Sequence, residues 1–199
     1  DVATLYTKLL KDEEDPLWLR QRNLEPSSSG LVFYWGMGAS FPELKVNNIF
    51  FSKNYEADFR AIFKDQRCPD DPTVYVNITS KIDASDAPEG GENWFVLVNA
   101  PHDAGQDWAA ETLRMRAAVI AVISAALGRD IGPLIRTESV MCPPDIARAT
   151  GSAMGSLYGI ASNSPLAAFN RHPNRHPGIK GLYCVGGSVH PGGGMPLVL

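Results

Sequence analysis

The residues of this chain that could do chemistry gather near its C-terminal end, in the sequence GGSVHPGGG. Five of the nine residues from 186 to 194 are glycine, and one histidine, His190, stands among them. Glycine has no Cβ atom, so a ligand can approach the backbone closely at such positions. The residues from Met195 onward, with Pro196, are typical of a first helical turn, which offers free N–H groups and partial positive charge. The pattern predicts a cradle for an anionic or electron-rich cofactor edge, or else a turn needed for packing alone.

Two other histidines raise the question of a metal site. His172 and His176 are four residues apart, which is a helical spacing for metal ligands. The sequence HPNRHP contains prolines that prevent a regular helix, so we predict a solvated turn and no metal. Ser188 lies two residues before His190, but the GxSxG pattern of a hydrolase nucleophile is absent, and no hydrolase is predicted.

Acidic residues also cluster, between two predicted strands. Asp83, Asp86, Glu89 and Glu92 do not have the spacing of a calcium-binding loop, and we predict a solvated loop instead. The formal net charge of −4 disfavours nucleic acid as the main partner. Three scattered cysteines without a CxxC pair favour a reducing, cytoplasmic setting.

The elements that must position these residues follow from apolar periodicity. Strands are predicted over residues 31–38, 47–52, 73–79, 94–100, 135–142 and 181–187, and helices over 54–65, 107–130 and 143–151. Residues 3–26 read as helical pieces broken at Pro16 and Pro26. The strands at 73–79 and 94–100 are expected to be antiparallel neighbours across the acidic loop. The fold class predicted is α+β, with a mixed, largely antiparallel sheet and packed helices.

The longest helix has clear ends and a predicted buried stripe. Asp107 can cap its start and Gly128 can cap its end. The stripe expected to face the core is Leu113, Ala117, Ile120, Ile123 and Leu127. The apolar-aromatic stretches LVFYWGM and WFVLV are compatible with a tunnel that holds a long hydrocarbon or with a plain sheet core.

The C-terminal motif carries a family resemblance. The sequence LYCVGGSVHPGGGMPLVL resembles the flavin signature of phytoene-desaturase-type carotenoid desaturases, and residues 47–101 resemble that family's substrate-domain sheet. Residues 77–108 are most similar to the hydroxycarotenoid 3,4-desaturase branch. The segment AAFNRHPNR departs from the family's Phe-Arg-Pro-x-Asn-Arg, so the resemblance assigns no role to Arg171 or Arg175.

The resemblance implies an FAD-dependent oxidoreductase that introduces double bonds into a carotenoid by hydride transfer to flavin. It implies a substrate-binding domain over residues 1–165 and part of the FAD domain over 166–199. The implied flavin contacts are Gly186, Gly187, His190, Pro191, Gly192, Gly193, Gly194 and Met195, and the implied substrate contacts are Phe33, Trp35, Phe95 and Tyr158. His190 is the only candidate acid or base among them, with support of packing as its other role.

The resemblance also implies that the chain is a fragment. Family members are longer and begin with a GxGxxG loop for the ADP part of FAD, which this sequence lacks. The 199-residue chain is therefore expected to be inactive and to retain no FAD by itself. The partner expected is a hydrophobic carotenoid, with peripheral membrane association of the longer protein compatible with that substrate. The alternatives are another amine-oxidase-like flavin oxidoreductase, or a non-catalytic binding domain whose glycine loop is structural.

Overall fold

The computed structural model describes residues 1–163 and 167–194. The chain divides into two compact units, which are described separately. Unit 1 contains Asp1–Ser29 and the residues from Pro143 onward, and unit 2 contains Gly30–Cys142. The division into a substrate-binding domain (residues 1–165) and part of an FAD domain (166–199) is defined by the ligands that each part would bind, and it stays a prediction. The compact units divide the chain at other positions.

Unit 2 is built on a five-stranded sheet. Its strands are β1 (Ser29–Met37), β2 (Asn47–Phe50), β3 (Val74–Asn77), β4 (Glu92–Ala100) and β5 (Ile135–Met141), in the spatial order β2-β3-β4-β1-β5. The pairs β2–β3, β3–β4 and β1–β5 are antiparallel. The predicted pairing of the strands at 73–79 and 94–100 is therefore confirmed, as is the α+β fold class.

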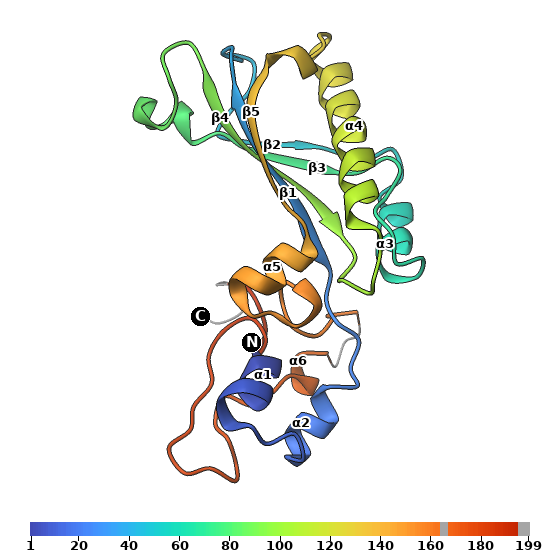
Figure 1. Cartoon of the computed structure of the whole chain (residues 1–199), viewed down its shortest axis with the longest axis vertical. Coiled ribbons are helices and arrows are strands. Elements are labelled where there is room, and N and C mark those ends of the chain that lie inside the picture. The colour runs from blue at the N-terminus through green and yellow to red at the C-terminus, as the bar shows by residue number, and fades with distance from the viewer. Residues whose placement is uncertain (164–166, 195–199) are drawn as a thin grey trace. The chain divides into compact units, whose positions relative to one another are not determined.

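One face of this sheet forms the core of unit 2. Alternate residues of β1, β3 and β4 point into it, because successive side chains in a strand lie on opposite faces. The helices α3 (Tyr55–Phe63) and α4 (Trp108–Leu127) lie on the same side of the sheet (Figure 1). The buried core on this face includes Leu31, Phe33, Trp35, Val74, Val76, Trp94, Val96, Val98, Met115, Val119 and Ile123.

The ends of α4 agree with the sequence, but its buried stripe agrees only in part. The Asp107 carboxylate accepts a hydrogen bond from the Ala110 N–H, and Gly128 ends the helix in the left-handed conformation. The buried residues are Trp108, Met115, Val119 and Ile123, whereas Leu113 is 71% exposed. The predicted stripe was therefore wrong at Leu113 and Ala117, which are exposed. It was right at Ile123, which is buried, and at Ile120 and Leu127, which pack partly buried against the core. The helix is apolar around most of its surface, so its pattern cannot select one face, and packing against the sheet selects it.

The acidic loop of unit 2 was also predicted incorrectly at one position. Short 3-10 turns, η2 (Thr79–Lys81) and η3 (Ala84–Asp86), occupy the loop. Glu92 is the first residue of β4 and is only 3% exposed. Its carboxylate pairs with the Lys81 ammonium at 2.6 Å and accepts hydrogen bonds from the Phe41 N–H and the Trp94 indole. Glu92 is therefore a buried anchor of the sheet and not part of a solvated loop.

Unit 1 consists of short helices and loops. These are α1 (Val2–Thr4), the π-helix η1 (Leu5–Leu10), α2 (Pro16–Gln21), α5 (Pro143–Thr150) and α6 (Ala167–Asn170), with a 3-10 turn at Ala153–Gly155 (η5). A further 3-10 turn, η4 (Gly132–Leu134), belongs to unit 2. Pro16 begins α2 after the Asp15 cap, so the predicted break there is confirmed. In the part of the chain that the structure describes, no helix combines the length and apolar character needed to cross a membrane.

The predicted strand over residues 181–187 is not present as a strand. Its only ladder contact in the described structure is a single bridge between Tyr183 and Arg175. Tyr183 is 66% exposed and Val185 is 91% exposed, so this apolar run is not buried. A strand needs a hydrogen-bonded neighbour along its length, and the described residues of unit 1 provide one bridge only. The predicted helix start from Met195 lies outside the described residues.

Candidate functional site

The glycine loop of unit 1, residues 186–194, is held against the segment that contains the two neighbouring histidines. Val189 forms a parallel bridge with His172 and is 3% exposed. The His190 N–H donates to the His172 carbonyl at 2.9 Å, and Asn174 Nδ2 donates to the His190 carbonyl at 2.8 Å. The loop is thus fixed at Val189 and through both backbone polar groups of His190. Met195, the last predicted flavin contact, lies outside the described residues.

Glycine serves two purposes in the loop: it allows positive φ angles, and it lets the backbone lie close to neighbouring side chains. Gly186 and Gly192 have φ angles of +125° and +123°, a region that residues with a side chain rarely adopt. A Cβ atom built on Gly193 would lie 2.8 Å from Cδ1 of Tyr158. Tyr158, predicted as a substrate contact, therefore packs against the glycine loop and is 50% exposed.

His190 is the titratable side chain within the loop. Its Nδ1 lies 2.9 Å from the Ala168 carbonyl oxygen, which can only accept a hydrogen bond, so Nδ1 carries the proton. In the neutral ring Nε2 is then an acceptor. The ring also lies against Phe169, with centroids 5.9 Å apart. His190 is therefore held in one tautomer. This arrangement is compatible with both roles predicted from the sequence, an acid-base group and a packing support.

An open groove runs along one side of the loop. It encloses about 250 Å³ and is lined by Gly186, Gly187 and Ser188 together with Leu157 and Gly159. Among the residues that the structure describes, no atom beyond the adjoining residues lies within 4 Å of the Cβ position of Gly186, so the bare backbone faces open space there. Two of the predicted flavin contacts therefore border a real groove. His190, Pro191, Gly192, Gly193 and Gly194 do not line it.

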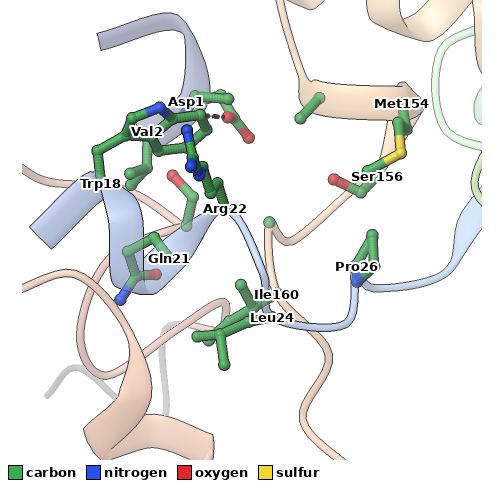
Figure 2. A pocket seen from close by; sticks show the side chains of 14 residues that line it. Asp1, Val2, Trp18, Gln21, Arg22, Leu24, Pro26, Met154, Ser156 and Ile160 are labelled. Carbon is green, nitrogen blue, oxygen red and sulfur yellow. Dashed lines mark hydrogen bonds between the residues drawn. The ribbon is translucent and has the colours of Figure 1, made fainter. Parts of the chain in front are cut away.

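A second, smaller cavity lies behind the groove and is shown in Figure 2. Its volume is about 90 Å³, and Ser156, Gly159 and Ser188 border both cavities. The Ser156 hydroxyl is directed into this cavity. Ser156 is 2% exposed and its Oγ has no hydrogen-bond partner in the described structure, and neither does Trp18 Nε1. Buried polar groups are normally satisfied. Of these two donors, Ser156 also borders the groove with Gly186, so an unsatisfied hydroxyl and bare backbone meet there, a combination that suits a ligand with a hydrogen-bond acceptor.

The two histidines before the loop are not in a solvated turn. His172 is fully buried and His176 is 3% exposed. The Tyr6 hydroxyl donates to His172 Nε2 at 2.7 Å, because His172 Nδ1 faces the Pro173 carbonyl oxygen at 2.8 Å. Burial lowers the pKa of His172 below its usual value. The prediction failed because the prolines that exclude a helix do not exclude burial.

His176 completes this buried cluster. Its Nδ1 accepts from the N–H groups of Gly178 and Ile179, so Nε2 carries the proton. Nε2 lies 3.2 Å from the Asp15 carboxylate without the alignment of a hydrogen bond. In the described residues no group of three or more histidine, cysteine or acidic side chains could hold a metal ion.

The predicted substrate residues of unit 2 fall on both faces of the sheet. Phe33 is fully buried and Trp35 is 2% exposed, both in the core, with ring centroids 5.5 Å apart. Phe95 is on the opposite face, where it packs edge-on against Tyr34 at 5.6 Å and Tyr75 at 6.4 Å. A substrate contact by Phe33 stays a prediction, and its observed environment is the packed core.

A shallow groove follows this second face, which we call the open face. It encloses about 470 Å³ and is lined by Tyr34, Trp35, Phe95, Pro88 and Glu138 among others. The structure thus brings Trp35 and Phe95 to one groove and leaves Phe33 behind it. Tyr34 was missed by the sequence analysis, although strict alternation along β1 places it opposite to Phe33 and Trp35.

Comparisons with known proteins agree with the C-terminal motif. The chain is 50% identical over 200 aligned residues to the 1-hydroxycarotenoid 3,4-desaturase of Flavobacterium sp. (strain P99-3). It is 33% identical over 199 residues to the 4,4'-diaponeurosporene oxygenase of Staphylococcus aureus (strain MRSA252). No protein-family model matches the chain. The two alignments include all of this chain. The chain belongs to a carotenoid desaturase-type family.

Membership in the carotenoid desaturase-type family confirms the resemblance found in the sequence. The chain spans 40% of the length of each of these relatives. The other residues whose roles sequence analysis did not identify are Arg171 and Tyr6. The signal that identifies each role is the burial of the polar group, which no local pattern shows.

Proposed function

We propose that the full-length protein containing this chain is an FAD-dependent carotenoid desaturase. The observation that carries the proposal is the glycine loop with its groove, where Gly186 presents bare backbone beside the unpartnered Ser156 hydroxyl. A relative of 50% identity is named a desaturase of hydroxycarotenoids, which supports that substrate class. When bound, FAD would accept a hydride from an allylic carbon, while the neighbouring carbon loses a proton and the new double bond forms.

The residues of unit 1 would hold the flavin and keep the loop in place. Gly186 and Gly187 would contact the ring through the backbone, since no side chain intrudes. His190 would lie beside them with Nδ1 bound to the Ala168 carbonyl, leaving Nε2 as its acceptor. The remaining loop residues, Pro191, Gly192, Gly193, Gly194 and Met195, stay proposed contacts.

The open face of unit 2 would contact the polyene. Its aromatic rings, Tyr34, Tyr75 and Phe95, form a continuous row in which each neighbouring pair is in edge contact. Flat apolar rings suit a long conjugated chain, because burial of apolar surface contributes about 25 cal/mol per Å². Trp35 would contribute to the lining of this groove, and the hydrogen bond from its indole N–H to the Glu138 carboxylate would hold it in place. Phe33 would support this layer from the core and Tyr158 would act near the glycine loop.

The test is to express the full-length protein, measure its flavin content and incubate it with hydroxylated and non-hydroxylated carotenoids. The expected product has two hydrogens fewer than the substrate and one more conjugated double bond. A relative of 33% identity is named an oxygenase, so insertion of oxygen is the second candidate, and mass spectrometry separates the two. Absence of both flavin and product would favour a non-catalytic binding domain with a structural glycine loop. Flavin without carotenoid turnover would favour another flavin oxidoreductase.

A further inference from the structure

Arg171 lies buried beneath the glycine loop, with only 4% of its surface exposed. Its Nη1 donates to the Tyr158 carbonyl at 2.6 Å and to the Gly187 carbonyl at 2.7 Å. Its Nη2 donates to the Ile160 carbonyl at 2.9 Å and to Ser162 Oγ at 3.0 Å. One planar guanidinium therefore ties the glycine loop to the segment that borders both cavities of unit 1.

All of these acceptors are uncharged. In the part of the chain that the structure describes, no carboxylate lies within salt-bridge distance of Arg171. Its Nε is buried and has no hydrogen-bond partner there. Burial lowers the pKa of Arg171 from its usual value, but arginine remains protonated in proteins. The loop is therefore built over a positive charge that no described anion neutralises, and such a charge is costly to bury.

The glycine loop passes directly over this charge. A Cβ atom built on Gly192 would lie 2.9 Å from Arg171 Nε and 3.3 Å from the guanidinium carbon. The absence of a side chain at Gly192 is what lets the backbone approach so closely. In a buried environment of low dielectric, a charge acts on its surroundings more strongly than at the surface.

We propose that Arg171 is a positioning residue for the cofactor, which fixes the glycine loop and favours the cofactor when it becomes negatively charged. The inference rests on the proposed function. Accepting a hydride adds two electrons and one proton to the neutral oxidised flavin ring, so the reduced ring carries one negative charge. The substrate supplies the hydride and releases a proton to solvent, so the charges balance. A fixed cation under the loop stabilises the reduced form more than the oxidised form.

The experiment compares full-length wild-type protein with Arg171→Gln, Arg171→Lys and the control Arg175→Gln. Arg175 lies in the same segment but is exposed, so Arg175→Gln removes one positive charge from the segment without removing a buried one. FAD affinity and the flavin midpoint potential are measured for each. Arg171→Gln should lower the ratio of affinities for reduced and oxidised FAD about tenfold, which for a two-electron couple lowers the potential by about 30 mV. Arg171→Lys keeps the charge but loses the planar fork, so FAD affinity should fall while the potential stays near wild type. Arg175→Gln should change neither.

An Arg171→Gln protein that binds FAD with an unchanged potential would overturn the inference and leave the proposed function standing. The same applies if Arg175→Gln lowers the potential as much as Arg171→Gln does. If Arg171→Gln fails to fold, Arg171→Lys decides: weaker FAD binding with an unchanged potential supports the inference, and unchanged binding overturns it. A wild-type protein that holds no flavin overturns the proposed function itself.

Discussion

Three glycines of the loop can be used to separate backbone strain from close contact. Gly186 has φ +125°, and no neighbour among residues 1–163 and 167–194 fills its Cβ position, so Gly186→Ala introduces strain alone. Gly192 has φ +123° and a Cβ position 2.9 Å from Arg171 Nε, so Gly192→Ala introduces strain and a clash. Gly193 is outside the positive-φ region and has a Cβ position 2.8 Å from Tyr158, so Gly193→Ala introduces a clash alone.

The expected costs follow from these three geometries. A residue with a side chain held in such a backbone conformation costs about 1–3 kcal/mol, which is the expected loss for Gly186→Ala. Tyr158 is half-exposed and can turn aside, at about 0.5–1.5 kcal/mol for an off-rotamer side chain. Arg171 is held by four hydrogen bonds, and displacing it loses at least one charged bond worth about 1.5–3 kcal/mol. Gly192→Ala should therefore cost about 2.5–6 kcal/mol.

The assay is denaturant unfolding of the full-length apoprotein together with its dissociation constant for FAD. A stability of about 5–15 kcal/mol lets Gly186→Ala and Gly193→Ala fold, and Gly192→Ala should be the least stable. In the apoprotein a variant loop can move and so relieve its strain, but FAD binding requires the original loop conformation. The strain energy is then subtracted from the binding free energy, and every 1.4 kcal/mol weakens FAD binding about tenfold. The reasoning is refuted if Gly192→Ala is no worse than Gly186→Ala. A loop that serves packing alone would show lower stability with normal FAD affinity in all three variants.

Three further predictions concern the buried polar groups. Burial by itself raises the pKa of the Glu92 carboxyl, but hydrogen bonds from Lys81 and neighbouring donors outweigh burial and lower this pKa. The ionised carboxylate therefore stabilises the fold above about pH 4.3, and this stabilisation is lost as the pH falls through the lowered pKa. Glu92→Gln should cost about 3–5 kcal/mol at neutral pH, with Lys81 left unpaired, and should flatten the acid limb of an unfolding curve. Because the pKa of His172 is lowered by burial, the unfolded state binds more protons, and stability should fall as the pH drops below about 6.5. His172→Gln should remove that slope between pH 7.5 and 5, and an unchanged slope would contradict the assignment. Tyr6→Phe leaves the His172 Nε2 acceptor unsatisfied and should cost about 1–3 kcal/mol by urea unfolding, whereas a neutral effect would show that this hydrogen bond does not contribute.

Local sequence determined most elements of the fold. The alternation Val74, Val76, Ile78 fixed which face of β3 is buried, because the period of a strand is two residues. The caps Asp107 and Gly128 fixed the ends of α4, since their hydrogen bonding and backbone conformation depend only on neighbouring residues. The glycine-histidine motif likewise identified the family, because it is a contiguous pattern.

Tertiary structure decided what depends on residues distant in the sequence. The helix α4 is apolar on most sides, so only contact with the sheet chose Met115 and Val119 over Leu113. The same is true of Arg171, whose acceptors at Tyr158 and Gly187 are 13 and 16 residues away, and of Tyr6, which meets His172 across 166 residues. Burial of a polar group is a property of the packed chain and has no local signature. The sequence alone therefore determined the family and the loop, and only the folded chain showed the charge beneath it.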